Sequence, residues 1–421
     1  MVYSTIVRRK AQPIQKIQRG YAMADIKSFL KEREKKEQNQ TDYKAKIRMH
    51  KLTTMYRLLL ICIVLAAVVV LLTVLYKRHI YTSYDVVASV EREKSSEATD
   101  VALRNMIITY SKDGAHCTDA KGNIIWNQTY EIQDIKVAIN RNVAAIGNYN
   151  GRDIYVQDTE GILGTINTTM PIQNIAVSAN GYVTAILSDT NVTRINTYDS
   201  SSGDLVADGE ARMDRSGYPG AISLSPDGQM LAVAYVYVDA GTLKTNIAFY
   251  NFGPVGKNVS DRMVSAYSYT DLLVPEICFL DDNTAFAVGD DSLLIYKGSQ
   301  IPVLEARYMF DREILSVFSG EKYIGLVFQS DDSENRYQMN VYNTSAQMVD
   351  SYYFNMDYTD IIFTEGNFII YNETQCIIRT YDGLEKFNGS FSKSVNVMIP
   401  TDSAYRYLLV TDDSIDTIQL K

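Results

Sequence analysis

Short apolar segments recur at a regular spacing in residues 101–421, and this repeat constrains the fold more than any other feature of the sequence. Each unit has an apolar strand, a turn, a second strand, a loop and a third strand. The units start at Asp134, Asn174, Gly220, Glu276, Glu313 and Asp360, at intervals of 40, 46, 56, 37 and 47 residues. A unit of roughly forty residues with four short strands has the spacing of a β-propeller blade.

The third strand is the clearest part of each unit. It is rich in β-branched and aromatic residues, which suit a strand, and the Asp, Asn or Gly residues that follow it suit a turn. The six third strands read DIYVQDTEG (153–161), RINTYDSSSG (194–203), NIAFYNFG (246–253), LLIYKG (293–298), MNVYNTS (339–345) and IIRTYDG (377–383). We therefore predict an all-β fold, a β-propeller, for residues 101–421. The structural alternative, a pair of stacked β-sandwiches, does not explain a four-strand period.

The two ends of the repeat indicate how the ring closes. Near the C-terminus, three strands lack a fourth strand to complete a blade. A strand at 123–130 has no set of strands before it with which to form a blade. A last blade that shares the strand 123–130 would hide both sheet edges. Residues 106–110 and 115–118 also read as strands, so this closing blade would have too many. We therefore expect seven blades, with eight as the alternative. The three C-terminal strands are VNVMI (395–399), YLLV (407–410) and DTIQL (416–420).

Residues 58–76 form a run of 19 residues without a charge, LLLICIVLAAVVVLLTVLY. At about 1.5 Å per residue, a helix of this length nearly crosses a hydrocarbon core of about 30 Å. A cleaved signal peptide is the competing interpretation. We favour an uncleaved transmembrane helix, because the run starts more than fifty residues into the chain and ends in Tyr76, Lys77 and Arg78 rather than in small residues.

The charges on either side of this run predict its orientation. Residues 1–57 hold 15 Lys and Arg, whereas only Lys77, Arg78, Arg92 and Lys94 follow the run closely. The cytoplasmic flank keeps the positive excess, so we expect a single-pass cell-membrane protein with its N-terminus in the cytoplasm and its C-terminal domain extracellular. The whole chain has a net charge of −9, of which residues 79–421 contribute −21.

The sequence thus divides into a basic cytoplasmic tail (1–57), a transmembrane helix (58–76), a stalk (77–100) and an extracellular propeller (101–421). The tail contains Arg8, Arg9 and Lys10 and a stretch at 25–38 with a thin apolar stripe. This stretch could lie on anionic lipid headgroups, but a largely disordered tail that only fixes the orientation explains it better. Nucleic-acid binding is not expected, since no aromatic residues are interleaved with the charges.

Several segments resemble known propeller sequences. SLSPDGQMLAVA (223–234) resembles the strand–turn–strand signature of WD40-like propellers. Four others resemble an uncharacterised family, a domain of unknown function, of single-pass membrane proteins with an extracellular propeller in Clostridia-type bacteria. The resemblance implies the fold and the location, and it transfers no activity and no functional residues. The four segments are WNQTYEIQ (126–133), NTTMPI (167–172), SGYP (216–219) and FYNFGPVGKN (249–258).

The residue types present exclude much catalytic chemistry. The only histidines are His50, His79 and His116, so the sequence offers no His pair or His/Cys cluster for a transition metal. No nucleophile, base and orienting group can be proposed together, and we expect no catalytic residue, no metal site and no cofactor. Cys117, Cys278 and Cys376 are expected in strands of distant blades as buried thiols rather than in a disulfide.

The repeat also predicts a strongly acidic surface. In a propeller, the loops between second and third strands and the loops between blades emerge on one face, around the central channel. A ring of carboxylates there could attract a cation, a polycationic peptide or an amino sugar, weakly and in a salt-sensitive way, and mutual repulsion would raise some of their pKa values. The alternative is that Asp is simply favoured in turns. The ligand-face candidates are Asp134, Glu276, Arg312, Glu313, Asp357 and Asp360.

Two classes of function remain open from the sequence. The first, which we favour, is a membrane-anchored, non-catalytic binding or scaffold module for a cell-envelope component or a protein partner. The alternative is an extracellular carbohydrate-active enzyme with paired carboxylates about 5–9 Å apart on the propeller face. The 31 tyrosines could stack on sugar rings in such an enzyme, but packing between strands explains them as well.

Overall fold

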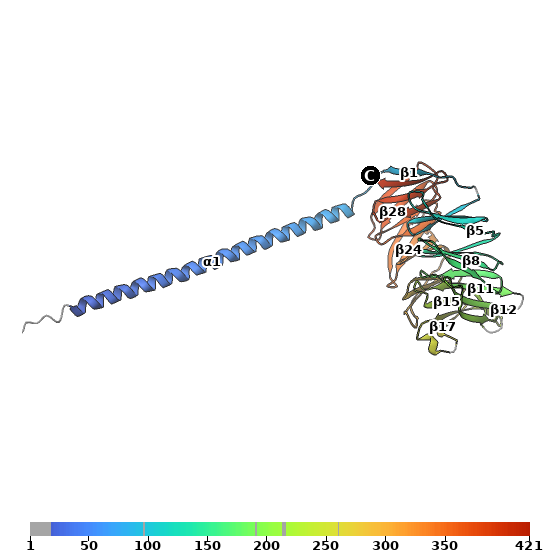
Figure 1. Cartoon of the computed structure of the whole chain (residues 1–421), viewed down its shortest axis with the longest axis horizontal. Helices are drawn as coiled ribbons and strands as arrows, with labels where there is room; N and C mark the ends of the chain where they lie inside the picture. The colour runs from blue at the N-terminus through green and yellow to red at the C-terminus, as the bar shows by residue number, and fades with distance from the viewer. Residues whose placement is uncertain (1–17, 96, 190–191, 213–215, 260) are drawn as a thin grey trace, which may run out of the picture. The chain divides into compact units, whose positions relative to one another are not determined.

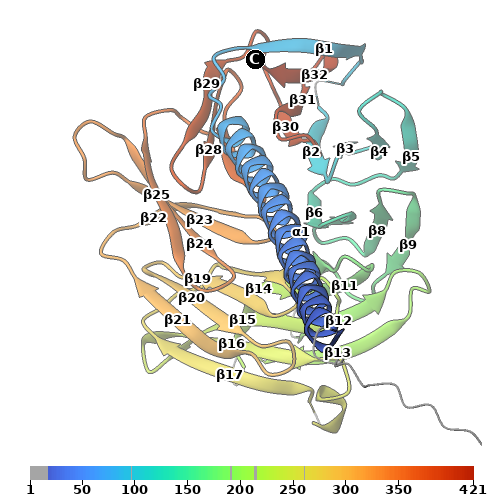
Figure 2. The same cartoon turned by 90° about the vertical axis from the view of Figure 1, so that its left-hand side faces the viewer.

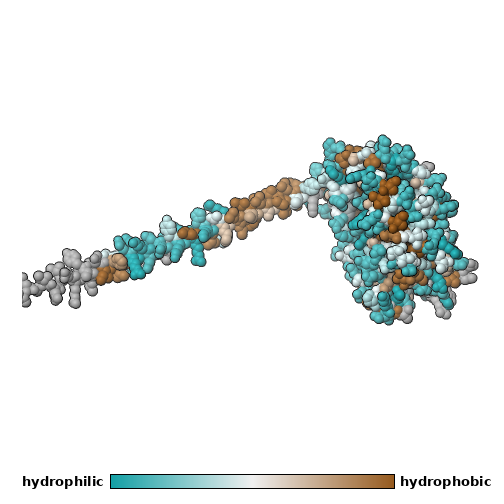
Figure 3. Space-filling model, in the orientation of Figure 1, coloured by the Kyte–Doolittle hydropathy of each residue, from teal (hydrophilic) through white to brown (hydrophobic). Residues whose placement is uncertain are grey.

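The computed structural model describes residues 18–95, 97–189, 192–212, 216–259 and 261–421, so Arg8, Arg9 and Lys10 lie outside the described residues. The chain forms two compact units, Met1–His79 and Ile80–Lys421. In the first unit, residues 25–38 and the apolar run 58–76 belong to one continuous helix, α1 (Gln18–Lys77). The side chains of the apolar run are exposed, and Figure 3 shows them as a brown stretch of the helix. By length and composition, α1 is a candidate single-pass membrane span.

The described residues of the second unit form eight four-stranded sheets, which are the blades of a β-propeller. The predicted fold class is confirmed, with eight blades, the alternative, rather than the preferred seven. We call the strands of each blade A to D from the axis outward. The A strands of successive blades contact one another, for example β6 with β10 and β14 with β18, so they line the axis (Figure 2).

The strands of blades 1 to 4 follow one another along the chain (Figure 1). Blade 1 is β2 (Thr99–Leu103), β3 (Met106–Ser111), β4 (Gly114–Thr118) and β5 (Ile124–Thr129), and blade 2 is β6 (Ile135–Asn140), β7 (Val143–Asn148), β8 (Asp153–Asp158) and β9 (Ile162–Asn167). Blade 3 is β10 (Ile172–Val177), β11 (Tyr182–Asp189), β12 (Val192–Asp199) and β13 (Leu205–Ala211), and blade 4 is β14 (Tyr218–Leu224), β15 (Met230–Asp239), β16 (Thr242–Asn251) and β17 (Met263–Thr270), with the short helix η1 (Gly256–Asn258) between β16 and β17.

Blades 5 to 7 continue this order, and blade 8 closes the ring. Blade 5 is β18 (Glu276–Asp281), β19 (Thr284–Val288), β20 (Ser292–Lys297) and β21 (Val303–Met309), and blade 6 is β22 (Ile314–Ser319), β23 (Tyr323–Gln329), β24 (Tyr337–Asn343) and β25 (Met348–Phe354). Blade 7 is β26 (Asp360–Phe363), β27 (Asn367–Tyr371), β28 (Gln375–Thr380) and β29 (Glu385–Ser390), and blade 8 is β30 (Val397–Pro400), β31 (Arg406–Val410), β32 (Ser414–Leu420) and β1 (Tyr84–Glu91).

The ring closes with a strand that the sequence analysis did not predict. The predicted closing strand 123–130 is β5, the D strand of blade 1, so the proposed shared blade is wrong. The missing fourth strand of blade 8 is β1, which pairs along β32 from Tyr84 opposite Leu420 to Glu91 opposite Ser414. The strands at 106–110 and 115–118 are then the two middle strands of a complete first blade. The closing blade therefore has no extra strands, and the propeller has eight blades.

This closure shortens the connection between helix and propeller. The segment 77–100 that we expected to be a stalk contains β1, and the propeller unit begins at Ile80 rather than at residue 101. Only residues 78–83 lie between the end of α1 and the start of β1. Such a strand has few local cues, since its partner β32 is more than three hundred residues away.

Each described D strand carries a bulge of one residue close to its start. A bulge twists an edge strand and interrupts its free hydrogen-bonding groups, which disfavours pairing with another molecule. β1 has this bulge at the same place as the other D strands, so it is a regular member of the repeat. The bulged residues are Val87, Ile125, Leu163, Val206, Val264, Glu305, Val349 and Lys386.

The two ends of the ring carry different loops because antiparallel strands alternate in direction. The loops between B and C strands and between successive blades emerge at one end, which we call the BC end. The loops between A and B strands and between C and D strands emerge at the other, the AB end. β1 starts beside Leu420, the last residue of β32, so the chain enters the propeller at the AB end.

Candidate functional site

The six ligand-face candidates all lie at the BC end. Asp134 precedes β6, Arg312 and Glu313 precede β22, and Asp357 lies in the loop before β26. Glu276 and Asp360 are the first residues of the A strands β18 and β26. The strand order therefore places them around one end of the ring, but their side chains behave in four different ways.

Arg312 supports its own blade rather than facing a ligand. Its guanidinium stacks on the ring of Phe328, 4.8 Å from the ring centre. It donates hydrogen bonds to the carbonyl oxygen of Gln329 at 3.1 Å and to the side chain of Gln338, and pairs with Asp331 at 3.2 Å. These contacts fix the guanidinium against the B and C strands of blade 6.

Asp357 is neutralised by a residue that the sequence analysis missed. The guanidinium of Arg336 lies 2.6 Å from its carboxylate, and the hydroxyl of Tyr337 donates a hydrogen bond to the same oxygen at 3.1 Å. Arg336 ends the loop SDDSENR (330–336), which joins β23 to β24. The charge of the Asp357 carboxylate is therefore already compensated by Arg336.

Glu276 and Asp360 have raised pKa values, and burial is the cause in both cases. No like-charged neighbour contributes to either shift, so the predicted mutual repulsion is not the reason. In Asp360, hydrogen bonds from the Ile361 amide at 2.8 Å and the Tyr371 hydroxyl at 3.4 Å partly oppose the effect. Among the described residues, neither carboxylate has a cationic partner.

Asp134 and Glu313 are exposed, and their carboxylates form no ion pair within the described part of the chain. The enzyme hypothesis would need two facing carboxylates at the propeller face. The two half-buried ones, Glu276 and Asp360, come from blades 5 and 7, which are not neighbours in the ring. This hypothesis gains no support from the geometry.

A buried ion network lies where blade 8 meets blade 1. The side chain of Asp100 is fully buried and pairs with Arg92 at 2.7 Å and Lys94 at 3.1 Å. The Thr109 hydroxyl donates to it at 2.7 Å, and Lys94 also reaches Asp412 at 3.2 Å. Burial opposes ionisation of Asp100, but Arg92, Thr109 and Lys94 together hold its pKa below the usual value.

This network corrects the role of two basic residues. We had counted Arg92 and Lys94 as charges beside the membrane span, but they follow β1 and tie it to blade 1 through Asp100. A second tie within blade 8 joins β1 to β32, where the Ser89 hydroxyl donates to Asp416 at 2.5 Å and Lys393 pairs with Asp416 at 3.2 Å. These contacts strengthen the closure of the ring.

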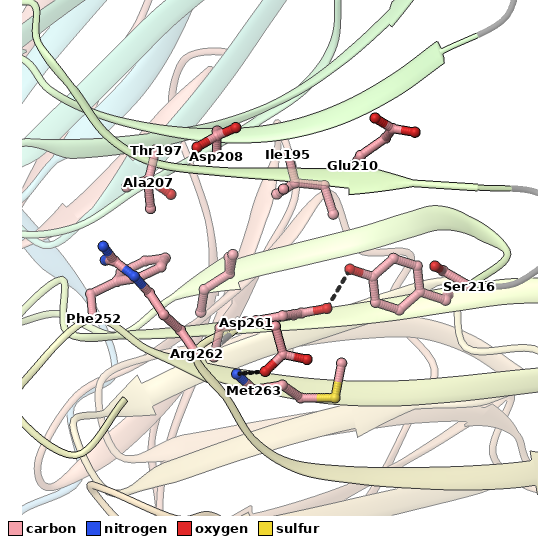
Figure 4. A pocket seen from close by; sticks show the side chains of 14 residues that line it. Ile195, Thr197, Ala207, Asp208, Glu210, Ser216, Phe252, Asp261, Arg262 and Met263 are labelled. Atoms are coloured by element: carbon pink, nitrogen blue, oxygen red, sulfur yellow. Dashed lines mark hydrogen bonds between the residues drawn. The ribbon is translucent and has the colours of Figure 1, made fainter. Parts of the chain in front are cut away.

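Cavities lie along the channel and in one seam between blades. One of about 390 Å³ lies along the channel among the A strands of blades 2 to 6, and reaches Glu321 at the AB end. A second, of about 560 Å³, opens among loops of the AB end, lined by Arg104, Lys322 and Glu365. A third, of about 260 Å³, lies in the seam between blades 3 and 4 (Figure 4).

The cysteines and acidic groups suggest no metal chemistry. Among the described residues, no group of three or more His, Cys, Asp or Glu side chains is placed to hold a metal ion. Cys117, Cys278 and Cys376 are free thiols. Burial raises the pKa of Cys117 and of Cys278 to about 12, so neither is a reactive thiolate at neutral pH.

Residues 76–420 match DUF5711, a family of unknown function. The chain belongs to this family. The match begins at the end of the apolar run and includes β1, in agreement with the propeller unit that starts at Ile80. No functionally curated protein matches the chain in sequence.

Several solved structures are similar to this chain in fold. Sqt1 from Saccharomyces cerevisiae aligns with a TM-score of 0.52 and 10% identity, over 80% of this chain and 100% of that one. BamB from Moraxella catarrhalis aligns with a TM-score of 0.47 and 13% identity, over 80% of this chain and 100% of that one. At such identities, these similarities concern the fold alone.

Proposed function

We propose that this protein is a membrane-anchored binding or scaffold module, whose extracellular propeller binds a cationic group of an envelope component or protein partner at its BC end without catalysing a reaction. The proposal has three parts, which are the anchor, the placement of the propeller and the charge of the binding face. Each is supported by separate residues, and the charge of the face is the observation that carries the binding function.

The anchor is the apolar part of α1. Its 19 uncharged residues suffice to cross a bilayer as a helix. With Arg92 and Lys94 held in the ion network of the propeller, only Lys77 and Arg78 remain close to the outer end of the run, against 15 basic residues before it. The charge asymmetry that supports a cytoplasmic N-terminus is therefore larger than the sequence analysis assumed.

The anchor and the propeller are joined by a short connection. Six residues, 78–83, join α1 to β1, and a fully extended chain of that length spans roughly 20 Å. The chain enters at the AB end, so that end is attached to the anchor. The BC end, with its acidic loops, is the opposite end of the ring.

The BC end has an excess of carboxylates over cations. Arg312 pairs with Asp331, Arg336 with Asp357 and Lys393 with Asp416. In the described residues, Asp134, Glu276, Glu313 and Asp360 have no such partner. Like charges around the end of a channel focus the field and raise the local concentration of cations. A cationic ligand group would also favour the ionised forms of Glu276 and Asp360.

The test uses the full chain in nanodiscs of neutral lipid, with a pentalysine peptide as the probe. Replacing Asp134→Asn and Glu313→Gln together should weaken binding several-fold at low salt and reduce its salt dependence, since both residues are exposed and form no ion pair with a described residue. Asp357 is left unchanged because its replacement would release Arg336.

The matched control removes the same charge from the AB end, with Glu160→Gln and Asp204→Asn, which are both exposed. We expect the control to bind pentalysine nearly as the unchanged protein does. Equal weakening in both double variants would show that the net charge of the propeller attracts the peptide, and the proposed binding face would then be wrong.

A further inference from the structure

The D strands of three consecutive blades, 4 to 6, carry a tyrosine at the same position. Counted from the bulged residue, the third residue along is Tyr267 in blade 4, Tyr308 in blade 5 and Tyr352 in blade 6. Tyr267 packs on Tyr296 of blade 5, with 5.2 Å between ring centres, and Tyr308 packs on Tyr342 of blade 6, at 4.7 Å.

These rings seal the seams between blades. Tyr296 and Tyr342 occupy equivalent places in their C strands. Each stands opposite the D-strand residue immediately before the bulge. Under the covering rings, Tyr296 is 0% and Tyr342 1% exposed. In each of these two seams, between blades 4 and 5 and between blades 5 and 6, a tyrosine of one blade is therefore covered by a tyrosine of the preceding blade.

Among the described residues, the seam between blades 3 and 4 has the covered tyrosine but no covering ring. Tyr250 of β16 stands opposite Met263, next to the bulge at Val264, and is the counterpart of Tyr296 and Tyr342. On β13 the third residue after the bulge is Gly209, and the fifth is Ala211, where blade 4 has Tyr269. Tyr250 is accordingly only half-buried, and its hydroxyl pairs with that of Tyr235 at 2.8 Å.

The missing ring leaves the cavity of about 260 Å³ (Figure 4). An apolar protein cavity of about 150 Å³ is large enough to bind benzene. The space beside the glycine is not blocked by backbone, because a Cβ at position 209 would meet its nearest neighbour, the carbonyl oxygen of Ile195, at 3.6 Å. The cavity is thus large enough for one six-membered ring above Tyr250.

The charges around the cavity balance, which favours a neutral ring. Arg194 lies 3.6 Å from Asp208 and 3.9 Å from Glu210, and Arg212 lies 2.7 Å from Glu210. Asp261 is followed in sequence by Arg262, which stacks over Phe252 at 5.8 Å. Polar groups at the rim, such as Asp208 and Asp261, could accept a hydrogen bond from a ring hydroxyl.

We propose that the seam between blades 3 and 4 is a binding site for a neutral, phenol-like aromatic ring, which stacks on Tyr250 in the place that Tyr267 and Tyr308 fill in the next two seams. The ring belongs either to a free aromatic compound or to a tyrosine side chain of a peptide. This site is separate from the BC end and does not depend on the cationic ligand proposed for it.

The experiment measures binding to the full chain in nanodiscs by ¹⁹F NMR, with 4-fluorophenol as the free ring and N-acetyl-3-fluorotyrosine amide as the peptide-like ring. Empty nanodiscs correct for partition into lipid. We expect saturable binding to the unchanged protein. Gly209→Tyr should weaken it at least tenfold, because the new side chain fills the cavity as Tyr267 does in the next seam. Tighter binding of the amide would identify a peptide as the source, and tighter binding of the phenol a free compound.

Gly161→Tyr is the matched control, since it adds the same ring in an exposed loop where no atom lies within 4 Å of the new Cβ. It should bind both probes as the unchanged protein does. If Gly209→Tyr fails to fold, Tyr250→Leu tests the same site, because it removes the ring on which the probe stacks. Absence of saturable binding, or equal binding by the Gly209 or Tyr250 variant and the unchanged protein, would overturn the proposal.

Discussion

Asp100 is a fully buried carboxylate that lies between two cations at the point where the ring closes. Replacing it by asparagine leaves the partly buried Arg92 without its carboxylate and leaves Lys94 with Asp412 alone. Removal of one partner from a buried ion pair typically costs about 3–5 kcal/mol. We therefore expect Asp100→Asn to lower the free energy of unfolding by about 3 kcal/mol, measured by chemical denaturation of residues 80–421, whereas Asp113→Asn, at an exposed site in the same blade, should have little effect.

The same replacement should have a defined dependence on pH. The pKa of Asp100 is lower in the folded state than in the unfolded chain, so its stabilising contribution is fully present above the unfolded value, about 3.9. The contribution is lost as the pH falls from there through the folded value. The difference between the unchanged protein and Asp100→Asn should thus be constant near neutral pH and shrink below about pH 4. A difference that grows in acid would contradict the network.

Side-chain direction explains which site residues could be predicted from the sequence. The position of each residue within the repeat was enough to assign Asp134, Glu276, Glu313 and Asp360 to the BC end, because this assignment depends only on the order of strands and loops. It could not show that Arg312 turns back onto Phe328. The seam cavity was also missed, since its signal is the absence of a ring at Gly209, and an absence is visible only once the D strands are aligned by their bulges.

At the scale of elements, the repeat predicted the regular blades and failed at the closure. The six predicted unit starts fall at the A strands β6, β10, β14, β18, β22 and β26. β1 was missed because most of its residues are exposed and its partner strand is at the other end of the chain. A cue was present, since Val86 and Val87 form an apolar pair at the start of the strand like Ile124 and Ile125 of β5.

The closing strand makes a clear prediction for truncated chains. A chain of residues 80–421 keeps β1 and should be soluble and unfold in one cooperative transition. A chain of residues 101–421 lacks β1, the ion network of Arg92, Lys94 and Asp100, and the first two residues of β2, and it leaves the edge of β32 unpaired. An unpaired edge promotes association with other chains, so we expect the shorter chain to aggregate. Calorimetry and size-exclusion chromatography would compare the two.

Addition of the missing strand provides the control for this comparison. A synthetic peptide of residues 80–100 should pair with β32 and increase the soluble fraction of the 101–421 chain, as strand addition does at other open sheet edges. A scrambled peptide of the same composition should not. If the 101–421 chain melts cooperatively at the temperature of the 80–421 chain without a peptide, β1 is not needed for closure.

At the scale of the whole molecule, the anchor and the closure belong to one continuous segment. Residues 78–83 connect the candidate membrane span to the strand that completes blade 8. In the proposed membrane-anchored protein, the propeller completes its last blade only after this segment has left the membrane insertion machinery, since blade 8 combines the first strand of the propeller with its last three. The anchor must remain uncleaved for the completed ring to stay attached to the membrane.

Topology can be tested with a site-specific protease sequence inserted after Gly161, an exposed loop of blade 2, in a full chain with an N-terminal tag. With the N-terminus inside and the propeller outside, protease added to intact cells should cut the chain and leave a tagged fragment of about 161 residues, while the chain without the insertion stays whole. A propeller that is released from the membrane and carries no tag, before any protease is added, would indicate a cleaved signal sequence. Cutting that occurs only after lysis would place the propeller in the cytoplasm, and the extracellular binding function would then be wrong.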